Sequence, residues 1–280
     1  MIAVYAMGGG LGHVARARRM VHALRALGFG DAPAAILSAS PLARGPDIVA
    51  VPRRLARSRA EFGAWLKATL RALSPSAVVV DAFPLGILGE LADPGVLPDT
   101  RLIHVARLLK WNAFRDAFPG TPRRYDATFT VEPLTPAHDA FLAANSGVVR
   151  SFDLSLDPES GAENSCAGLP RPVWLVVHSG PAAEVHQLLE FAAVRAGEER
   201  AAPQFVVVSP RALALPTGVT HLAHPRAWEL FAPADRIVTA CGFNSMLEAS
   251  PWRGKHLYLP FERRFDDQHL RAQRATSLQC

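Results

Sequence analysis

The feature that most constrains the fold is an alternation of short apolar runs, rich in β-branched residues, with longer Ala-, Leu- and Arg-containing stretches at helical spacing. Such alternation is typical of α/β units built on a parallel sheet. In the first half, strands are expected at 2–7, 34–38, 48–51, 77–80, 102–106 and 127–131, and helices at 14–27, 56–73 and 85–91. In the second half, strands are expected at 173–178, 205–208, 219–222, 237–239 and 256–259, and helices at 182–196 and 244–249.

The alternation breaks once, over a polar stretch at 152–172 that contains Asp157-Pro158 and Ser160-Gly161 and has no sustained period. This stretch is expected to be a linker between an N-terminal α/β domain, 1–151, and a C-terminal α/β domain, 173–280. Parallel sheets bind ligands at the carboxyl ends of their strands. Two Rossmann-like domains that face each other across a cleft are therefore the expected architecture.

Composition narrows the class of protein. Of 280 residues 49% are hydrophobic and 20% charged, as in a globular chain. No apolar run approaches the roughly 20 residues that span a bilayer, and the first residues lack the basic start of a signal peptide, so a cytoplasmic protein is expected. Cys166, Cys241 and Cys280 have no metal-ligand spacing.

The charge is unevenly distributed. Residues 1–150 carry 18 basic and 11 acidic residues, or +7, whereas residues 151–280 carry 12 and 14, or −2. Aromatic residues do not interleave regularly with the arginines, so nucleic acid is not an expected partner. A basic first half instead suggests an anionic or membrane-associated ligand on that domain.

The first motif is a glycine-rich loop directly after the first expected strand and before the first expected helix. It contains Gly8, Gly9, Gly10 and Gly12 and ends at His13. The glycines permit close approach of a ligand, and the helix start offers free N–H groups to an anion. The loop is not the dinucleotide fingerprint, because His13 stands where G-x-G-x-x-G needs its last glycine. A tight strand-to-helix turn is the open alternative.

His13 is a candidate catalytic base. A neutral imidazole can take a proton from a hydroxyl or water that attacks an electrophilic carbon. A structural histidine is the alternative.

The second motif follows the expected strand at 237–239. It comprises Gly242, Asn244, Ser245 and Glu248, and after the next strand come Asp266, Asp267 and Gln268. Asn244 or Ser245 capping a helix, with Glu248 in its first turn, explains the local spacing. It does not explain Gln268.

Together the two motifs resemble the nucleotide-sugar glycosyltransferases of the GT-B fold. The resemblance rests on the loop from Gly8 to His13 and on Gly242, Ser245, Glu248, Pro260 and Gln268, in that order. It is strongest to the branch containing the enzyme that adds N-acetylglucosamine to the lipid-linked peptidoglycan precursor.

The resemblance implies that 1–151 is the acceptor-side domain and that 173–280 is the nucleotide-sugar-binding domain. It also implies roles for single residues. Glu248 is implied to bind the ribose hydroxyls, Ser245 and the backbone around Gly242 the diphosphate, and Gln268 the sugar. Asn244 belongs to the same helix start. The loop with Gly9, Gly10 and Gly12 is implied to face the leaving diphosphate.

The sequence departs from the family pattern at two places. Where a Gly-Ser-x-Gly turn is usual, it has Ser179 and Gly180 after His178, still suited to a phosphate, and then Pro181, which lacks an N–H and favours the first position of a helix. The chain also ends about 12 residues after Gln268, where the fold usually adds a further helix.

Three further candidates lie in the first half. Asp81 follows an apolar strand. It is expected either to orient His13 or an acceptor hydroxyl, or to cap a helix at 85–91. His104 is expected to be a buried strand residue. The stretch 107–115 mixes basic and aromatic residues, which fits an amphipathic helix, with contact to a membrane or an anionic lipid-linked acceptor as the alternative.

The resulting functional hypothesis is an inverting, metal-independent glycosyltransferase with a UDP-linked sugar donor, no cofactor, and His13 and Asp81 as catalytic residues. Its acceptor is undetermined, with an anionic or lipid-linked molecule favoured by the charge, and peripheral contact with the inner face of the membrane is left open. Two alternatives remain. One is a nucleotide-sugar hydrolase of the same fold, whose loop Gly-x-Gly-His-x-x-Arg is matched by Gly10, Gly12, His13 and Arg16. The other is a non-catalytic nucleotide-sugar-binding subunit.

Overall fold

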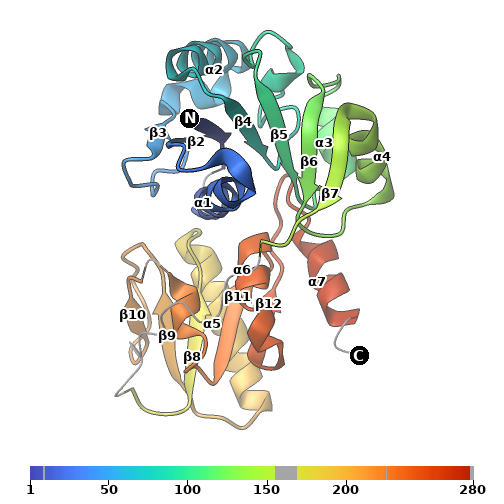
Figure 1. Ribbon diagram of the computed structural model, residues 1–280. Coiled ribbons are helices and arrows are strands. Elements are labelled where there is room, and N and C mark those ends of the chain that lie inside the picture. The colour runs from blue at the N-terminus through green and yellow to red at the C-terminus, as the bar shows by residue number, and fades with distance from the viewer. Residues whose placement is uncertain (9, 155–168, 225, 278–280) are drawn as a thin grey trace. The chain divides into compact units, whose positions relative to one another are not determined.

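The computed structural model describes residues 1–8, 10–154, 169–224 and 226–277 (Figure 1). The chain forms two compact units. One comprises Met1–Leu154 and Arg264–Asp266, and the other Ser155–Arg263 and Asp267–Cys280. No helix in the described ranges is both long and apolar enough to cross a bilayer.

The N-terminal unit is built on a seven-stranded sheet with the order β3-β2-β1-β4-β5-β6-β7, and each paired strand runs parallel to its neighbour (Figure 1). Its strands are β1 Ile2–Tyr5, β2 Ala34–Ser38, β3 Ile48–Ala50, β4 Ala77–Asp81, β5 Arg101–Ala106, β6 Tyr125–Thr130 and β7 Ser146–Ser151. Its α-helices are α1 Gly12–Leu24, α2 Arg59–Leu73, α3 Trp111–Ala117 and α4 Pro136–Asn145.

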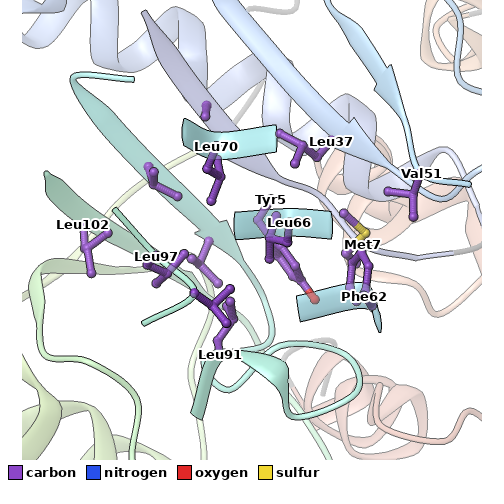
Figure 2. Close-up of a cluster of buried hydrophobic side chains, with 14 of the residues drawn as sticks. Tyr5, Met7, Leu37, Val51, Phe62, Leu66, Leu70, Leu91, Leu97 and Leu102 are labelled. Atoms are coloured by element: carbon purple, nitrogen blue, oxygen red, sulfur yellow. The ribbon is translucent and has the colours of Figure 1, made fainter. Parts of the chain in front are cut away.

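Alternate residues of each strand in this unit contribute to the buried core on opposite faces of the sheet. Ala3 and Tyr5 on β1 pack with Phe62, Leu66 and Leu70 of α2 in one buried cluster (Figure 2). Side chains alternate between the faces of a strand, so the buried residues between them on β1 serve the opposite face. A sheet covered on both faces explains why its strands are continuous apolar runs.

The C-terminal unit has a five-stranded parallel sheet with the order β10-β9-β8-β11-β12. Its strands are β8 Val173–Val177, β9 Gln204–Val208, β10 Thr220–Leu222, β11 Arg236–Ala240 and β12 His256–Leu259. Its α-helices are α5 Ala182–Glu198, α6 Phe243–Glu248 and α7 Gln268–Ser277. Buried clusters lie on both faces, one of them with Val185, Leu188 and Ala192 of α5.

Every strand expected from the sequence is present, with ends shifted by at most two residues. The helix expected at 85–91 is wrong. Gly86 and Gly89 there have φ of 82° and 80°, so the chain turns instead, with a short 3-10 turn at Glu90–Ala92. Asp81 is therefore not the cap of a helix at that place.

Elements missing from the expectation are α4, β7 and α7, whereas α3 agrees in part with the amphipathic helix expected within 107–115. Thr135 stands immediately before α4 and Pro136 is its first residue, a helix-start signal that was present in the sequence. Helix α7 begins at Gln268 itself and was not expected from the sequence.

The stretch 107–115 packs inward. Arg107, Leu108, Leu109, Trp111 and Phe114 are all buried, and α3 starts at Trp111. These apolar side chains belong to the core of the N-terminal unit, so they offer no face to a membrane.

Two histidines of the N-terminal unit are fully buried, as expected for His104. His104 stacks on Tyr125, and His138 on Trp111 with ring centroids 3.9 Å apart. Burial lowers the pKa of His104 to about 4 and that of His138 to about 3. Both rings are therefore neutral in the folded chain at pH 5, whereas an exposed histidine in the unfolded chain is largely protonated there.

Acid is consequently expected to destabilise the protein well above pH 4. The free energy of unfolding should fall as pH drops below about 6.5, by about 1.4 kcal/mol per pH unit for each such histidine, until the folded-state pKa is reached. His138→Phe keeps a ring on Trp111 but removes one titrating group. Urea unfolding measures the free energy of unfolding at pH 7 and at pH 5. Its decrease between the two pH values should be about 2 kcal/mol smaller in this variant than in the original chain. An equal loss in both proteins would contradict this explanation.

Candidate functional site

In the N-terminal unit, His13 and Asp81 meet at the carboxyl ends of two neighbouring strands. Asp81 is the last residue of β4, and His13 is the second residue of α1, which follows β1 through the glycine loop. His13 Nδ1 lies 2.6 Å from Asp81 Oδ2. The structure therefore brings together the two residues that were expected to be catalytic.

Arg16 binds the same carboxylate, and its Nη2 lies 3.2 Å from His13 Nδ1. It lies one helical turn after His13, and its Nε and Nη2 donate to Oδ1 and Oδ2 of Asp81 at 2.5 and 2.7 Å. Both side chains are 3% exposed. Burial alone raises the pKa of Asp81, but the Arg16 guanidinium and His13 hold it well below its usual range, so the carboxylate is ionised.

The imidazole is oriented and neutral. Burial lowers the pKa of His13, and this outweighs the attraction of the Asp81 carboxylate. With Nδ1 beside an ionised carboxylate, the tautomer that fits is Nδ1–H, which leaves the lone pair on Nε2. Phe83 stacks on the ring with centroids 5.8 Å apart.

The glycine loop fits around this ring. A Cβ at Gly8 would overlap Cδ2 and Nε2 of His13, so only glycine leaves the ring in place. At Gly10 a Cβ would meet nothing within 4 Å, so packing does not demand glycine there. Gly12 is the first residue of α1, and Gly9 lies outside the described residues.

The C-terminal unit begins in the same way, with β8, a glycine turn and α5. His178 Nε2 lies 2.7 Å from Glu184 Oε2, and Arg263 Nη1 donates to Glu184 Oε1 at 2.7 Å. Burial alone raises the pKa of Glu184, but His178 and Arg263 lower it to about 2. A Cβ at Gly180 would overlap the His178 ring, as one at Gly8 would overlap His13.

This second cluster was not foreseen from the sequence. Ser179 and Gly180 lie in the turn beside it, and Pro181 stands at the N-cap of α5 rather than at its first residue. The available signal was the repeated order of strand, glycine turn and helix, with His178 directly after β8.

Helix α6 carries the second motif. Its N-cap is Gly242, and no side chain makes a cap hydrogen bond. The interpretation of Asn244 or Ser245 as the cap of this helix is therefore wrong. Both lie in its first turn, and Glu248 is its last residue; all three side chains are half-buried. A Cβ at Gly242 would meet nothing within 4 Å, and its φ is −67°, so glycine is again not required by packing or φ.

Gln268 lies elsewhere in this unit. It is buried, and its Oε1 accepts the Phe261 N–H at 3.0 Å. One turn further along α7, Arg271 donates from Nη1 to the Cys241 carbonyl at 2.8 Å. Arg271, which sequence reasoning missed, thereby ties α7 to the residue before Gly242.

The two aspartates before Gln268 have separate structural partners. Asp266 belongs to the N-terminal unit and pairs with Arg107. Asp267 Oδ1 accepts the Leu270 N–H at 3.0 Å in the first turn of α7. Among the described residues, no three His, Cys, Asp or Glu side chains form a group that could hold a metal ion.

No protein-family model matches the sequence, and no curated protein does. Solved structures do match. The spinosyn rhamnosyltransferase SpnG complexed with thymidine diphosphate aligns with a TM-score of 0.58 and 14% identity over 99% of this chain and 84% of that one. A UGT transferase from Siraitia grosvenorii in complex with UDP aligns with a TM-score of 0.55 and 16% identity, over 97% of this chain and 82% of that one. MurG from Acinetobacter baumannii aligns with a TM-score of 0.51 and 12% identity, over 99% of this chain and 82% of that one.

Proposed function

We propose that this chain, which has the GT-B fold of those glycosyltransferases, transfers a sugar from a nucleoside-diphosphate donor to a hydroxyl group, with inversion at the anomeric carbon and without a metal ion. The observation that carries the proposal is the buried arrangement of His13, Asp81 and Arg16 at the carboxyl ends of β1 and β4. The carboxyl ends of parallel strands are where ligands of α/β folds bind.

The proposed reaction uses His13 as general base. The acceptor hydroxyl gives its proton to Nε2 while its oxygen forms a bond to the anomeric carbon. The bond from that carbon to the β-phosphate oxygen breaks, and the nucleoside diphosphate leaves with the bonding electrons. Asp81 accepts the Nδ1–H and stabilises the imidazolium that forms, and Arg16 keeps Asp81 ionised and in place.

The donor is proposed to bind the C-terminal unit. A carboxylate at Glu248 suits the two ribose hydroxyls, and Ser245 with the backbone at Gly242 suits the diphosphate, whose charge is stabilised by N–H groups rather than a metal ion. The open space beside Gly242 supports this placement. So do the two similar structures that contain thymidine diphosphate and UDP. By the resemblance the donor is UDP-linked. Gln268 is proposed to contact the sugar.

Glu248→Ala is expected to raise the Kd for UDP about 10- to 100-fold. Each hydrogen bond to a charged group contributes about 1.5–3 kcal/mol, and the variant removes the acceptor of the ribose hydroxyls. Isothermal titration calorimetry measures the Kd. Glu190→Ala, at an exposed position of α5, is the matched control and should leave the Kd unchanged. An unchanged Kd in Glu248→Ala, with the same melting temperature, would remove Glu248 from the site.

One observation favours hydrolysis as a second candidate function. Arg16, the last residue of the hydrolase-like pattern, is part of the His13 cluster rather than an exposed helix residue. In a hydrolase, water would take the place of the acceptor hydroxyl at Nε2. Release of free sugar from the donor alone, at a rate that added alcohols do not increase, would favour this candidate over transfer.

A further inference from the structure

A hollow of about 770 Å³ lies at the amino ends of β4, β5 and β6 in the N-terminal unit, three strands that are neighbours in the sheet (Figure 1). Its lining includes Arg101, the first residue of β5, and Arg123 and Arg124, which directly precede β6. Ligand cavities in proteins commonly measure roughly 300–1,000 Å³. The hollow therefore has the size of a small-molecule site, and three guanidinium groups gather in it.

The hollow is separate from the site at His13. Asp81, which pairs with His13, is the last residue of β4, whereas Ser76, which lines the hollow, directly precedes that strand. The five residues of β4, at about 3.3 Å each, place roughly 16 Å between the two ends. The proposed transfer reaction makes no use of this edge of the sheet.

Arg101 offers a guanidinium group with free donors. Its Cζ lies 5.3 Å from the centroid of the Phe29 ring, and the residue is exposed. A guanidinium that lies over a ring keeps its five N–H donors available at its edge. Within the described ranges, no carboxylate or carbonyl accepts a hydrogen bond from this side chain. An anion can therefore bind these donors without breaking an existing hydrogen bond.

Backbone carbonyl groups hold Arg123 and Arg124 in place. Arg123 Nη1 donates to the Pro98 carbonyl at 2.6 Å, and Arg124 Nη2 donates to the Ser146 carbonyl at 3.0 Å. No carboxylate in the described part of the chain pairs with Arg124. A carbonyl is a neutral acceptor, so it orients a guanidinium without cancelling its charge. Side chains that are already oriented also lose less conformational entropy when a ligand binds.

The two acidic residues of the lining do not neutralise these arginines. Asp126 Oδ2 accepts the Leu102 N–H at 2.7 Å and is thus engaged by the backbone. Asp99 Oδ1 lies 2.7 Å from Arg123 Nη2, but the Asp99 side chain is fully exposed, and exposed ion pairs contribute little. An incoming anion can therefore compete with Asp99 for Arg123.

We infer that the hollow binds a soluble small molecule that carries a chain of at least three phosphate groups. A guanidinium binds phosphate oxygens through two parallel hydrogen bonds, so each of the three arginines can take one phosphate group. Arg101 and Arg124 lie at the starts of neighbouring strands, which are about 4.8 Å apart, so linked phosphate groups can reach both. The inference goes beyond the proposed function and does not depend on it.

Tripolyphosphate, titrated into the full chain and followed by isothermal titration calorimetry, tests the inference. Its Kd should be about 1 mM or lower in about 50 mM NaCl and should rise in about 200 mM NaCl, because salt screens exposed charges. Inorganic phosphate should bind at least about tenfold more weakly, since it reaches fewer guanidinium groups. No binding of tripolyphosphate, or equally tight binding of inorganic phosphate, would overturn the inference.

A double variant, Arg101→Gln with Arg124→Gln, locates the binding. It should raise the Kd for tripolyphosphate at least about tenfold. The matched control, Arg53→Gln with Arg54→Gln, removes two exposed charges of the same unit outside the lining and should leave the Kd nearly unchanged. Equal weakening in the two double variants would show unspecific attraction by the basic unit and contradict a site in the hollow.

Ser245→Glu separates the hollow from the diphosphate site proposed on the C-terminal unit. Its carboxylate should weaken binding of UDP and leave binding of tripolyphosphate in place, whereas the arginine double variant should do the reverse. Loss of tripolyphosphate binding in folded Ser245→Glu, with none in the arginine variant, would assign the phosphate chain to the nucleotide site and overturn the inference. Unchanged binding of UDP in Ser245→Glu would count against the proposed function alone.

A membrane surface is the other source of clustered phosphate groups. The hollow encloses a small molecule, whereas lipid headgroups form a plane, so vesicles of phosphatidylcholine and phosphatidylglycerol should leave the chain in the supernatant after centrifugation. Sedimentation with these vesicles that is lost in the arginine double variant, without binding of tripolyphosphate, would assign the arginines to a membrane and refute the inference.

Discussion

His13→Ala is expected to lower the rate of donor consumption about 10²- to 10⁴-fold, the usual contribution of a positioned general base. The Kd for UDP should not change, because His13 is proposed to act on the acceptor. Initial rates of nucleoside diphosphate release measure the first effect, and calorimetry measures the second. His22→Ala, at an exposed position of the same helix, is the matched control and should be as active as the original chain.

Retention of the rate in His13→Ala would contradict a role as base. Together with intact UDP binding it would favour a non-catalytic nucleotide-sugar-binding subunit. The pH dependence gives a further check. The base must be neutral and its pKa lies below 6.5, so the rate should rise with pH in the acidic range and already be level at pH 7.

Asp81→Asn is expected to reduce the rate by roughly 10³-fold or more, although the side chain keeps its size. The carboxylate selects the Nδ1–H tautomer and stabilises the imidazolium, and a neutral amide does neither; in a serine protease triad the equivalent change costs about 10⁴-fold. Since Asp81 raises the pKa of His13, its replacement should also move the acidic limb of the rate profile to lower pH. A purely structural role would lower the melting temperature without that shift.

Asp47→Asn is the matched control for this variant. Asp47 also accepts two hydrogen bonds from one arginine, Arg18, in the same unit, but the Arg18 side chain is 48% exposed and the pair lies apart from His13. Its replacement should leave both the rate and the profile unchanged. Equal losses in the two variants would show that any aspartate–arginine pair matters to this unit and that Asp81 has no specific role.

The strands could be predicted because a parallel sheet covered on both faces needs continuous apolar runs, and turns with Gly, Pro or Asp bound those runs. The helix expected at 85–91 failed because its apolar spacing was given more weight than Gly86 and Gly89, whose positive φ ends a helix. Ile87 and Leu88 of that stretch instead line a cavity of about 160 Å³ together with Met7 and Phe62.

The site was predictable only in part. The pairing of His13 with Asp81 followed from the rule that the ends of parallel strands meet, although 68 positions separate them. No comparable rule predicted from the sequence that Arg16 would pair with Asp81. The buried pair of Tyr5 and Glu90 is 85 positions apart and depends on how a loop folds back, which local sequence patterns do not encode.

The central claim is displacement at the anomeric carbon with a base at His13, and the anomer formed first tests it most directly. UDP-glucose, UDP-N-acetylglucosamine and thymidine diphosphate glucose, all α-linked, would each be incubated with the full chain and 4-fluorobenzyl alcohol in the presence of EDTA, and followed by ¹H NMR. At least one donor should be consumed. The first product should be the β-glycoside, or the free β-sugar if water is the acceptor. The reaction should be lost in His13→Ala. An α-product formed first, consumption at the same rate in His13→Ala, or no consumption of any donor would contradict the claim.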